Sequence, residues 1–138
     1  MLLKTCITTM LLALSGIASA ADTITWDPHI RDGYKCSSAP NYCNISGSAK
    51  IHIENTSDED HSYSVHIGMT SDGGLPVGGA GQWSANITIP AHGTWDTNQT
   101  VAGYVKFNNR GQREIDIVGF TSGYQQFYEM QKGWIEAV

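Results

Sequence analysis

The chain has 138 residues and a formal net charge of −5, and only 15% of its residues are charged. This length accommodates one domain with its own hydrophobic core. The acidic balance, without any cluster of lysine and arginine, excludes proteins that bind nucleic acid or anionic membranes through a basic patch.

The first twenty residues predict a cleaved signal peptide. Lys4 supplies a positive charge, residues 6–17 are mostly apolar, and Ala18-Ser19-Ala20 has the small-x-small pattern of a cleavage site. The apolar run is shorter than the roughly 20 residues that a membrane-spanning helix needs. We therefore expect removal of residues 1–20. Residues 21–138 then form a single exported domain, periplasmic or secreted, with no stable insertion in a membrane.

Two cysteines remain in this mature chain, and they lie in a loop-like stretch. Cys36 and Cys43 fall within residues 33–47, which are rich in Gly, Ser, Pro and Asn. Export exposes both thiols to oxidation, and their spacing is not Cys-x-x-Cys. The sequence therefore predicts a structural disulfide that closes a short loop, with a redox pair or a metal site as the alternative.

Along the rest of the chain, apolar residues recur with the period of two that is typical of half-buried strands. The expected strands cover residues 23–26, 50–54, 62–67, 83–89, 101–107, 112–119, 124–130 and 134–138. No segment has a convincing helical pattern. Regular strand spacing with turn residues between the strands predicts an all-β fold, a single immunoglobulin-like antiparallel β-sandwich of about seven to nine strands.

Consecutive strands are expected to pair as hairpins. Residues 50–54 and 62–67 flank a polar turn, and one register that buries their apolar residues places His52 opposite His66. The alternative register places Lys50 opposite His66. Directly opposed residues have Cβ atoms about 5 Å apart, so the two imidazoles would share a zinc or copper ion. The competing interpretation is two solvated histidines on an exposed sheet face.

A second hairpin is expected from residues 101–107 and 112–119, with its turn at Gly111. The preferred register pairs Lys106 with Glu114 on the outer face, and the other register pairs Lys106 with Asp116. Glu114 and Asp116 share one strand face, but a lysine partner favours a structural role over catalysis. A third hairpin is expected to turn at residues 131–133.

Two loops and one aromatic residue are further candidates for binding. The acidic turn at residues 58–60, together with Asp72, is a possible calcium site, although such turns are usually only solvated. Trp95, beside a turn, is the first candidate for stacking on a sugar. Long loops on a rigid scaffold often bind partners, and the glycine-rich loop at residues 71–81 is the most unusual of these. Its candidate residues are Asp72, Gly73, Gly74, Leu75, Pro76, Gly78 and Gly79.

Two short motifs carry a resemblance to a known family. One strand ends in Ile51-His52-Ile53-Glu54-Asn55-Thr56, and a later strand ends in Ile89-Pro90-Ala91-His92-Gly93-Thr94. Over about residues 45–120 this layout resembles immunoglobulin-like bacterial domains of the CARDB type. The resemblance implies a β-sandwich with an adhesive or accessory role outside the cytoplasm, and it transfers no functional residue.

No catalytic motif occurs in the sequence. It contains no His-Glu-x-x-His, no Gly-x-Ser-x-Gly and no reactive-cysteine signature. We therefore expect an exported noncatalytic domain that acts through protein–protein contact, as an adhesive, envelope-accessory or inhibitor-like module, without an obligatory cofactor. The alternatives are a small module that binds metal or carbohydrate, and a small hydrolase whose site has no recognised motif.

Overall fold

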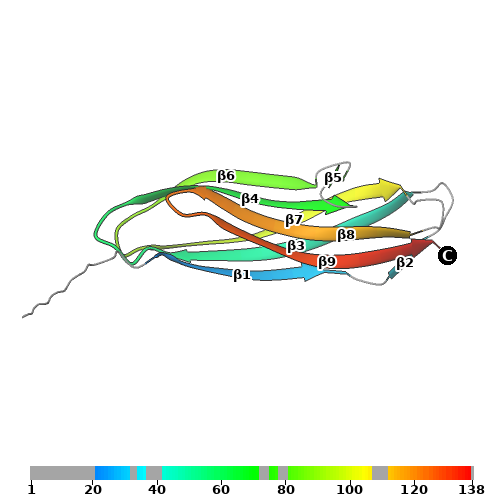
Figure 1. The fold of residues 1–138 in the computed structure, drawn as a ribbon, viewed down its shortest axis with the longest axis horizontal. Coiled ribbons are helices and arrows are strands. Elements are labelled where there is room, and N and C mark those ends of the chain that lie inside the picture. The colour runs from blue at the N-terminus through cyan, green and yellow to red at the C-terminus, as the bar shows by residue number, and fades with distance from the viewer. Residues whose placement is uncertain are drawn as a thin grey trace, which may run out of the picture.

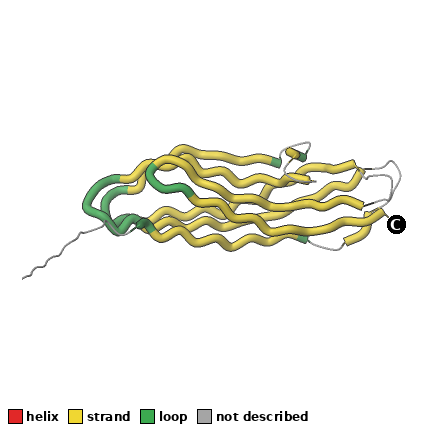
Figure 2. Tube along the Cα trace, viewed as in Figure 1, coloured by secondary structure: helices red, strands yellow, loops and turns green. Residues whose placement is uncertain are grey.

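The structure, a computed structural model, describes residues 21–31, 34–36, 42–71, 75–77, 81–106 and 112–137. The predicted signal peptide lies outside these residues. The described residues form nine strands and no helix (Figure 2), so none of them forms a helix that could cross a membrane. The strands are β1 (Thr23–Ile30), β2 (Tyr34–Cys36), β3 (Tyr42–Glu54), β4 (His61–Ser71), β5 (Leu75–Pro76), β6 (Gln82–Ile89), β7 (Thr94–Lys106), β8 (Gln112–Gly123) and β9 (Phe127–Ala137).

The strands form two sheets that pack face to face as an elongated sandwich (Figure 1). The three-stranded sheet has the order β1-β3-β7, and the six-stranded sheet has the order β2-β9-β8-β4-β5, with β6 also paired to β4. All of these pairs are antiparallel except β2 with β9, which is parallel. The structure thus confirms the prediction of an all-β sandwich.

The predicted hairpin between residues 50–54 and 62–67 is wrong. β3 belongs to the three-stranded sheet and β4 to the six-stranded sheet, and the chain crosses between the sheets at residues 55–60. His52 lies opposite Asp96 of β7, whereas His66 lies opposite Phe120 of β8. A crossing between sheets turns both apolar faces toward the core, just as a hairpin would, so strand alternation alone does not separate the two arrangements.

The other two predicted hairpins are also wrong. β7 pairs with β3, while β8 pairs with β4 and β9, so β7 and β8 lie in different sheets. The Glu114 carboxylate therefore meets Lys132 of β9, at 2.6 Å from Nζ to Oε2, instead of Lys106. The turn expected at residues 131–133 lies inside the continuous strand β9, where Gly133 is buried opposite Ile115. The chain turns earlier, at residues 124–126.

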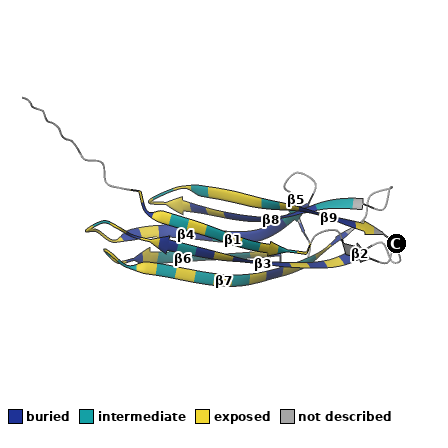
Figure 3. Ribbon diagram, turned by 90° about the horizontal axis from the view of Figure 1, so that it is seen from below, coloured by how far each residue is buried: buried dark blue, intermediate teal, exposed yellow. Residues whose placement is uncertain are grey.

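The core lies between the sheets, and the burial pattern alternates along the strands (Figure 3). Both sheets contribute fully buried apolar side chains, among them Ile51, Ile53, Val65, Ile67, Met69, Ile115, Ile117 and Ile135. The sheets approach closely where Trp26 of β1 packs on Gly119 of β8. A Cβ atom on Gly119 would lie 2.2 Å from Cζ3 of the Trp26 ring. Glycine at this position therefore makes room for the indole between the sheets.

Asn55 joins the two motifs that carried the family resemblance. Its side chain is fully buried at the β3–β4 crossing, and its Oδ1 accepts a hydrogen bond from Ser57 N at 2.9 Å. Its Nδ2 donates to the backbone carbonyls of Glu59, Ile89 and Pro90 at 2.7, 3.1 and 3.2 Å. One amide thus connects the crossing to the end of β6, and the backbone N–H of Asn55 adds a bond to Gly93 O.

Candidate functional site

The six-stranded sheet exposes a row of large apolar side chains on its outer face. Phe120, Tyr128, Met130 and Trp134 are 39%, 60%, 38% and 52% exposed. The alternation of β9 places its three members on one side of the strand, and Phe120 of β8 lies directly opposite Tyr128. We call these four residues, together with His66 of β4, the aromatic face.

The rings of the aromatic face are arranged across neighbouring strands. His66 lies opposite Phe120, and their rings are stacked at 4.4 Å between centroids with an interplanar angle of 8°. Each of these two rings therefore covers one face of the other. Aromatic rings together with a flexible methionine suit the irregular surface of a protein.

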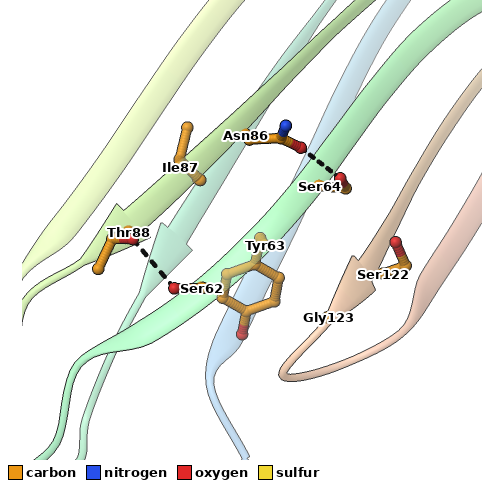
Figure 4. Close-up of a pocket in the computed structure, with 8 residues that line it drawn as sticks. All are labelled: Ser62, Tyr63, Ser64, Asn86, Ile87, Thr88, Ser122 and Gly123. Carbon is orange, nitrogen blue, oxygen red and sulfur yellow. Dashed lines mark hydrogen bonds between the residues drawn. The ribbon is translucent and has the colours of Figure 1, made fainter.

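A shallow groove lies at one end of the same sheet (Figure 4), with a volume of about 380 Å³. Its lining comes from neighbouring parts of β4, β6 and β8, and consists of Ser62, Tyr63, Ser64, Asn86, Ile87, Thr88, Ser122 and Gly123. The exposed polar side chains pair across the strands: Ser62 with Thr88 at 3.0 Å, and Ser64 with Asn86 at 2.5 Å. The groove is thus lined by uncharged hydroxyl and amide groups.

The outer face of the three-stranded sheet has a different character. A depression of about 510 Å³ on it is lined mostly by polar and charged side chains, and His52 Nδ1 lies 2.6 Å from Asp96 Oδ1 there. His52 and His66 point away from the core on opposite outer faces of the sandwich. The structure therefore does not bring together the two imidazoles expected to share a metal ion.

The remaining predicted metal and sugar candidates have structural partners. In the acidic turn, Asp58 Oδ1 lies 2.7 Å from His92 Nε2, and Asp60 Oδ1 accepts a hydrogen bond from Ala91 N. Within the described ranges, no group of three or more His, Cys, Asp or Glu side chains could hold a metal ion. Trp95 is partly buried and packs against the core, so it does not form an exposed platform.

Several candidates fall in parts of the chain for which the structure describes little. Leu75 and Pro76 form β5, which pairs with the end of β4. Cys43 is buried in β3, but the side chain of Cys36 lies outside the described residues, so the disulfide stays a prediction. The remaining candidates of the glycine-rich loop also lie outside the described residues: Asp72, Gly73, Gly74, Gly78 and Gly79.

A buried polar network, which the sequence did not predict, fixes the start of β1. Asp22 is 3% exposed, and its Oδ2 lies 2.8 Å from His61 Nδ1 and 2.5 Å from the hydroxyl of Tyr63. Burial, reinforced by the neighbouring carboxylate, raises the pKa of Tyr63, so its phenol stays protonated and donates to Asp22. The ring of Tyr124 stacks on His61 at 3.4 Å between centroids.

Ser57 extends this network, and its connectivity is that of a nucleophilic triad. Its Oγ lies 3.0 Å from His61 Nε2, while His61 Nδ1 contacts Asp22. The same Oγ is also 3.0 Å from Glu59 O and accepts a hydrogen bond from Glu59 N. The three acidic residues that follow Ser57 would oppose the negative charge that acyl transfer creates. We therefore interpret the Ser57–His61–Asp22 network as structural.

Asp116 is a second buried carboxyl group, on the outer side of β8. It is 2% exposed and lies opposite Thr70 of β4 and Lys132 of β9. Desolvation is the main cause that raises its pKa, and the charge of Glu114 adds to this effect. Because the folded chain binds this proton more tightly than the unfolded chain does, ionisation of Asp116 destabilises the fold as the pH rises.

The Asp116→Asn variant is therefore expected to melt a few degrees above the wild type at pH 7. The advantage should shrink as the pH falls, and vanish near pH 3.9, the ordinary pKa of an aspartate in the unfolded chain. The asparagine oxygen still accepts the backbone hydrogen bond from Gly133. Thermal unfolding between pH 3.5 and 8 measures this difference. A lower melting temperature for Asp116→Asn at pH 7 would contradict it.

Comparison with known proteins does not assign the chain to a family. No family model matches the chain, and no curated protein matches it. A solved crystal structure from the Northeast Structural Genomics Consortium is similar over 88% of this chain and 90% of the other, with 10% sequence identity and a TM-score of 0.39. A likeness at that level carries no argument about function.

Proposed function

We propose that this chain is an exported, noncatalytic β-sandwich domain that binds a protein partner through its aromatic face. The observation that carries the proposal is the gathering of four exposed large apolar side chains on the outer face of β8 and β9. Exposed apolar side chains that gather on one face mark interaction sites on soluble proteins. Here Phe120, Tyr128 and Met130 are neighbours, and the Lys132–Glu114 ion pair lies between them and Trp134. Tyr, Trp, Phe and Met are also the residues enriched in protein interfaces.

Three further features support this proposal. The combination of exposed aromatic rings with the flexible Met130 favours the irregular surface of a protein over a flat sugar ring. The signal-peptide pattern of residues 1–20 and the spacing of Cys36 and Cys43 favour an exported domain with a disulfide. The acidic surroundings of Ser57 favour a noncatalytic role for the most triad-like group in the described part of the chain.

A crosslinking experiment in the native host tests the proposal. A photoreactive amino acid replaces Tyr128 in one variant and Tyr104 in another. Tyr104 is 46% exposed and lies on the three-stranded sheet, so it is a matched control. We expect a discrete protein adduct at position 128 and none at position 104. Equal adducts at both positions, or none at either, would contradict the proposal.

The affinity for the captured protein then measures how much the aromatic face contributes to binding. The double variant Tyr128→Ala/Trp134→Ala removes two exposed anchors without opening the core, so its melting temperature should be unchanged. Its dissociation constant for the partner should rise at least about 30-fold, as expected for interface hot spots. Tyr104→Ala should bind normally. Unchanged affinity in the double variant would contradict the assignment of the aromatic face as the binding site.

Carbohydrate binding in the groove is the second candidate function. The observation that favours it is the lining of uncharged hydroxyl and amide groups, of which Asn86 and Ser64 are members. Glycan-array binding that is lost in Asn86→Ala and kept in Tyr128→Ala/Trp134→Ala would support this candidate over the protein partner.

A further inference from the structure

One oxygen of the buried Asp22 carboxyl group has no donor. Oδ2 contacts both His61 and Tyr63, but Oδ1 is buried and has no hydrogen-bond partner among the described residues. A buried carboxylate oxygen is normally satisfied, because water no longer reaches it. The missing donor must therefore come from a group close to Asp22.

The position of Asp22 in the sequence points to that group. The predicted cleavage site lies between Ala20 and Ala21, so Asp22 is the second residue of the processed chain. Its backbone is held in place, because Asp22 O accepts a hydrogen bond from Gln125 Nε2 at 3.1 Å and β1 starts at Thr23. Ala21 is exposed and directly precedes Asp22, so processing would create an amine one residue from the unsatisfied carboxylate.

We propose that Asp22 Oδ1 is the acceptor for the α-ammonium group of Ala21 that processing creates. Hydrolysis of the Ala20–Ala21 bond by a signal peptidase breaks the C–N bond. Water supplies a hydroxyl to the Ala20 carboxyl group and a proton to the new amine, which takes up a further proton near neutral pH. This role of the N-terminus goes beyond the proposed function, and it rests on that function only in assuming that the domain is exported.

Processing changes the chemistry of the donor. Before cleavage, the Ala21 nitrogen is a neutral amide with a single hydrogen. After cleavage it is a cation with three hydrogens, and hydrogen bonds between ionised groups are about twice as strong as neutral ones. The titratable groups around the new ion pair are His61 and Tyr63 of β4, Tyr124 of the β8–β9 turn, and Glu54, which lies opposite Thr23. The processed N-terminus thereby fastens β1 to β4.

The test compares the processed chain in two forms, one with a free Ala21 amine and one with an acetylated amine. Every described strand lies within residues 23–137, so both forms contain the whole fold. At pH 6 the free form should melt about 3–6 °C higher than the acetylated form. An ammonium group that gains a partner has a raised pKa. The advantage should therefore be complete below about pH 7.7, the ordinary value for an α-amine, and be lost as the pH rises through the raised value.

Two variants make the test specific. Asp22→Asn should abolish the difference between the free and acetylated forms, whereas Asp27→Asn, at an exposed carboxylate of the same strand, should preserve it. If Asp22→Asn does not fold, the pKa of the Ala21 amine in the wild type, measured by NMR, decides the question. Equal melting of the two forms, or an α-amine pKa at its ordinary value, would overturn the inference. Neither result depends on the aromatic face, so the proposed function is tested separately.

Discussion

Replacing Asn55 by alanine is expected to lower the free energy of unfolding by about 3 kcal/mol, the largest effect of any substitution considered for this fold. The truncation removes the amide that donates to the carbonyls of Ile89 and Pro90. The buried Ile89 oxygen loses this donor, whereas Pro90 O keeps its hydrogen bond from Gly93 N. It also removes the acceptor for Ser57 N. The crossing between the sheets and the end of β6 therefore lose their common attachment.

Urea denaturation of Asn55→Ala measures this loss. Asn98→Ala, at an exposed position on β7, is the control and should stay within about 0.5 kcal/mol of the wild type. Asn55→Asp keeps the acceptor for Ser57 but turns a carboxylate toward the carbonyl oxygens, so it should be at least as unstable as the alanine variant. A cost below about 1 kcal/mol for Asn55→Ala would show that water replaces the lost donor.

Gly119→Ala is expected to cost about 2 kcal/mol, because the added methyl group collides with the Trp26 indole between the two sheets. Both groups lie between the sheets, and a fused ring bends away less easily than a flexible chain. Ser122→Ala, at an exposed position on the same strand, should change stability by less than about 0.5 kcal/mol.

A second substitution can show that the indole causes this effect. Trp26→Leu removes the part of the ring that the new methyl group would meet, at its own cost in buried apolar area. The double variant Trp26→Leu/Gly119→Ala should therefore be more stable than the sum of the single changes predicts, by at least about 1 kcal/mol. If the two changes in the free energy of unfolding are strictly additive, the indole is not the cause of the strain in Gly119→Ala.

The approximate positions of several strands could be read from the sequence because these strands alternate between a buried and an exposed side. The pattern at residues 83–89, for example, corresponds to β6, Gln82–Ile89. β2 and β5 were not predicted, and β3 and β7 begin well before the expected residues 50 and 101. Strand pairing could not be read in the same way. Alternation identifies the side that faces the core, but it does not distinguish a neighbour in the same sheet from a strand across the core. Two of the three expected hairpins were wrong because this information is missing from the sequence. The third was wrong because the polar Lys-Gly step inside β9 resembles a turn.

The error in β9 also misplaced two members of the aromatic face. With a turn at residues 131–133, Tyr128 and Trp134 are assigned to two paired strands of a hairpin. In the continuous strand they are six positions apart, so they point the same way. Trp95 was the first candidate from the sequence because its neighbours are polar, yet it packs against the core.

The Asp22 network could not be predicted for a different reason. Its members come from residue 22 and from residues 57–63, and only the pairing of β1 with β3 and the crossing to β4 bring them together. No short motif records such a contact. The one sequence signal is the position of Asp22 beside the predicted cleavage site, and this position becomes informative only once the side chain is known to be buried.

The location of β9 within its sheet determines when this protein can fold. The last described strand, β9, is an interior strand, since it pairs with β8 on one side and with β2, near the start of the described residues, on the other. The six-stranded sheet therefore closes only after the C-terminal residues have been made and brought into place. Sandwiches dominated by such distant pairings fold in milliseconds to seconds, which is slow for a small domain.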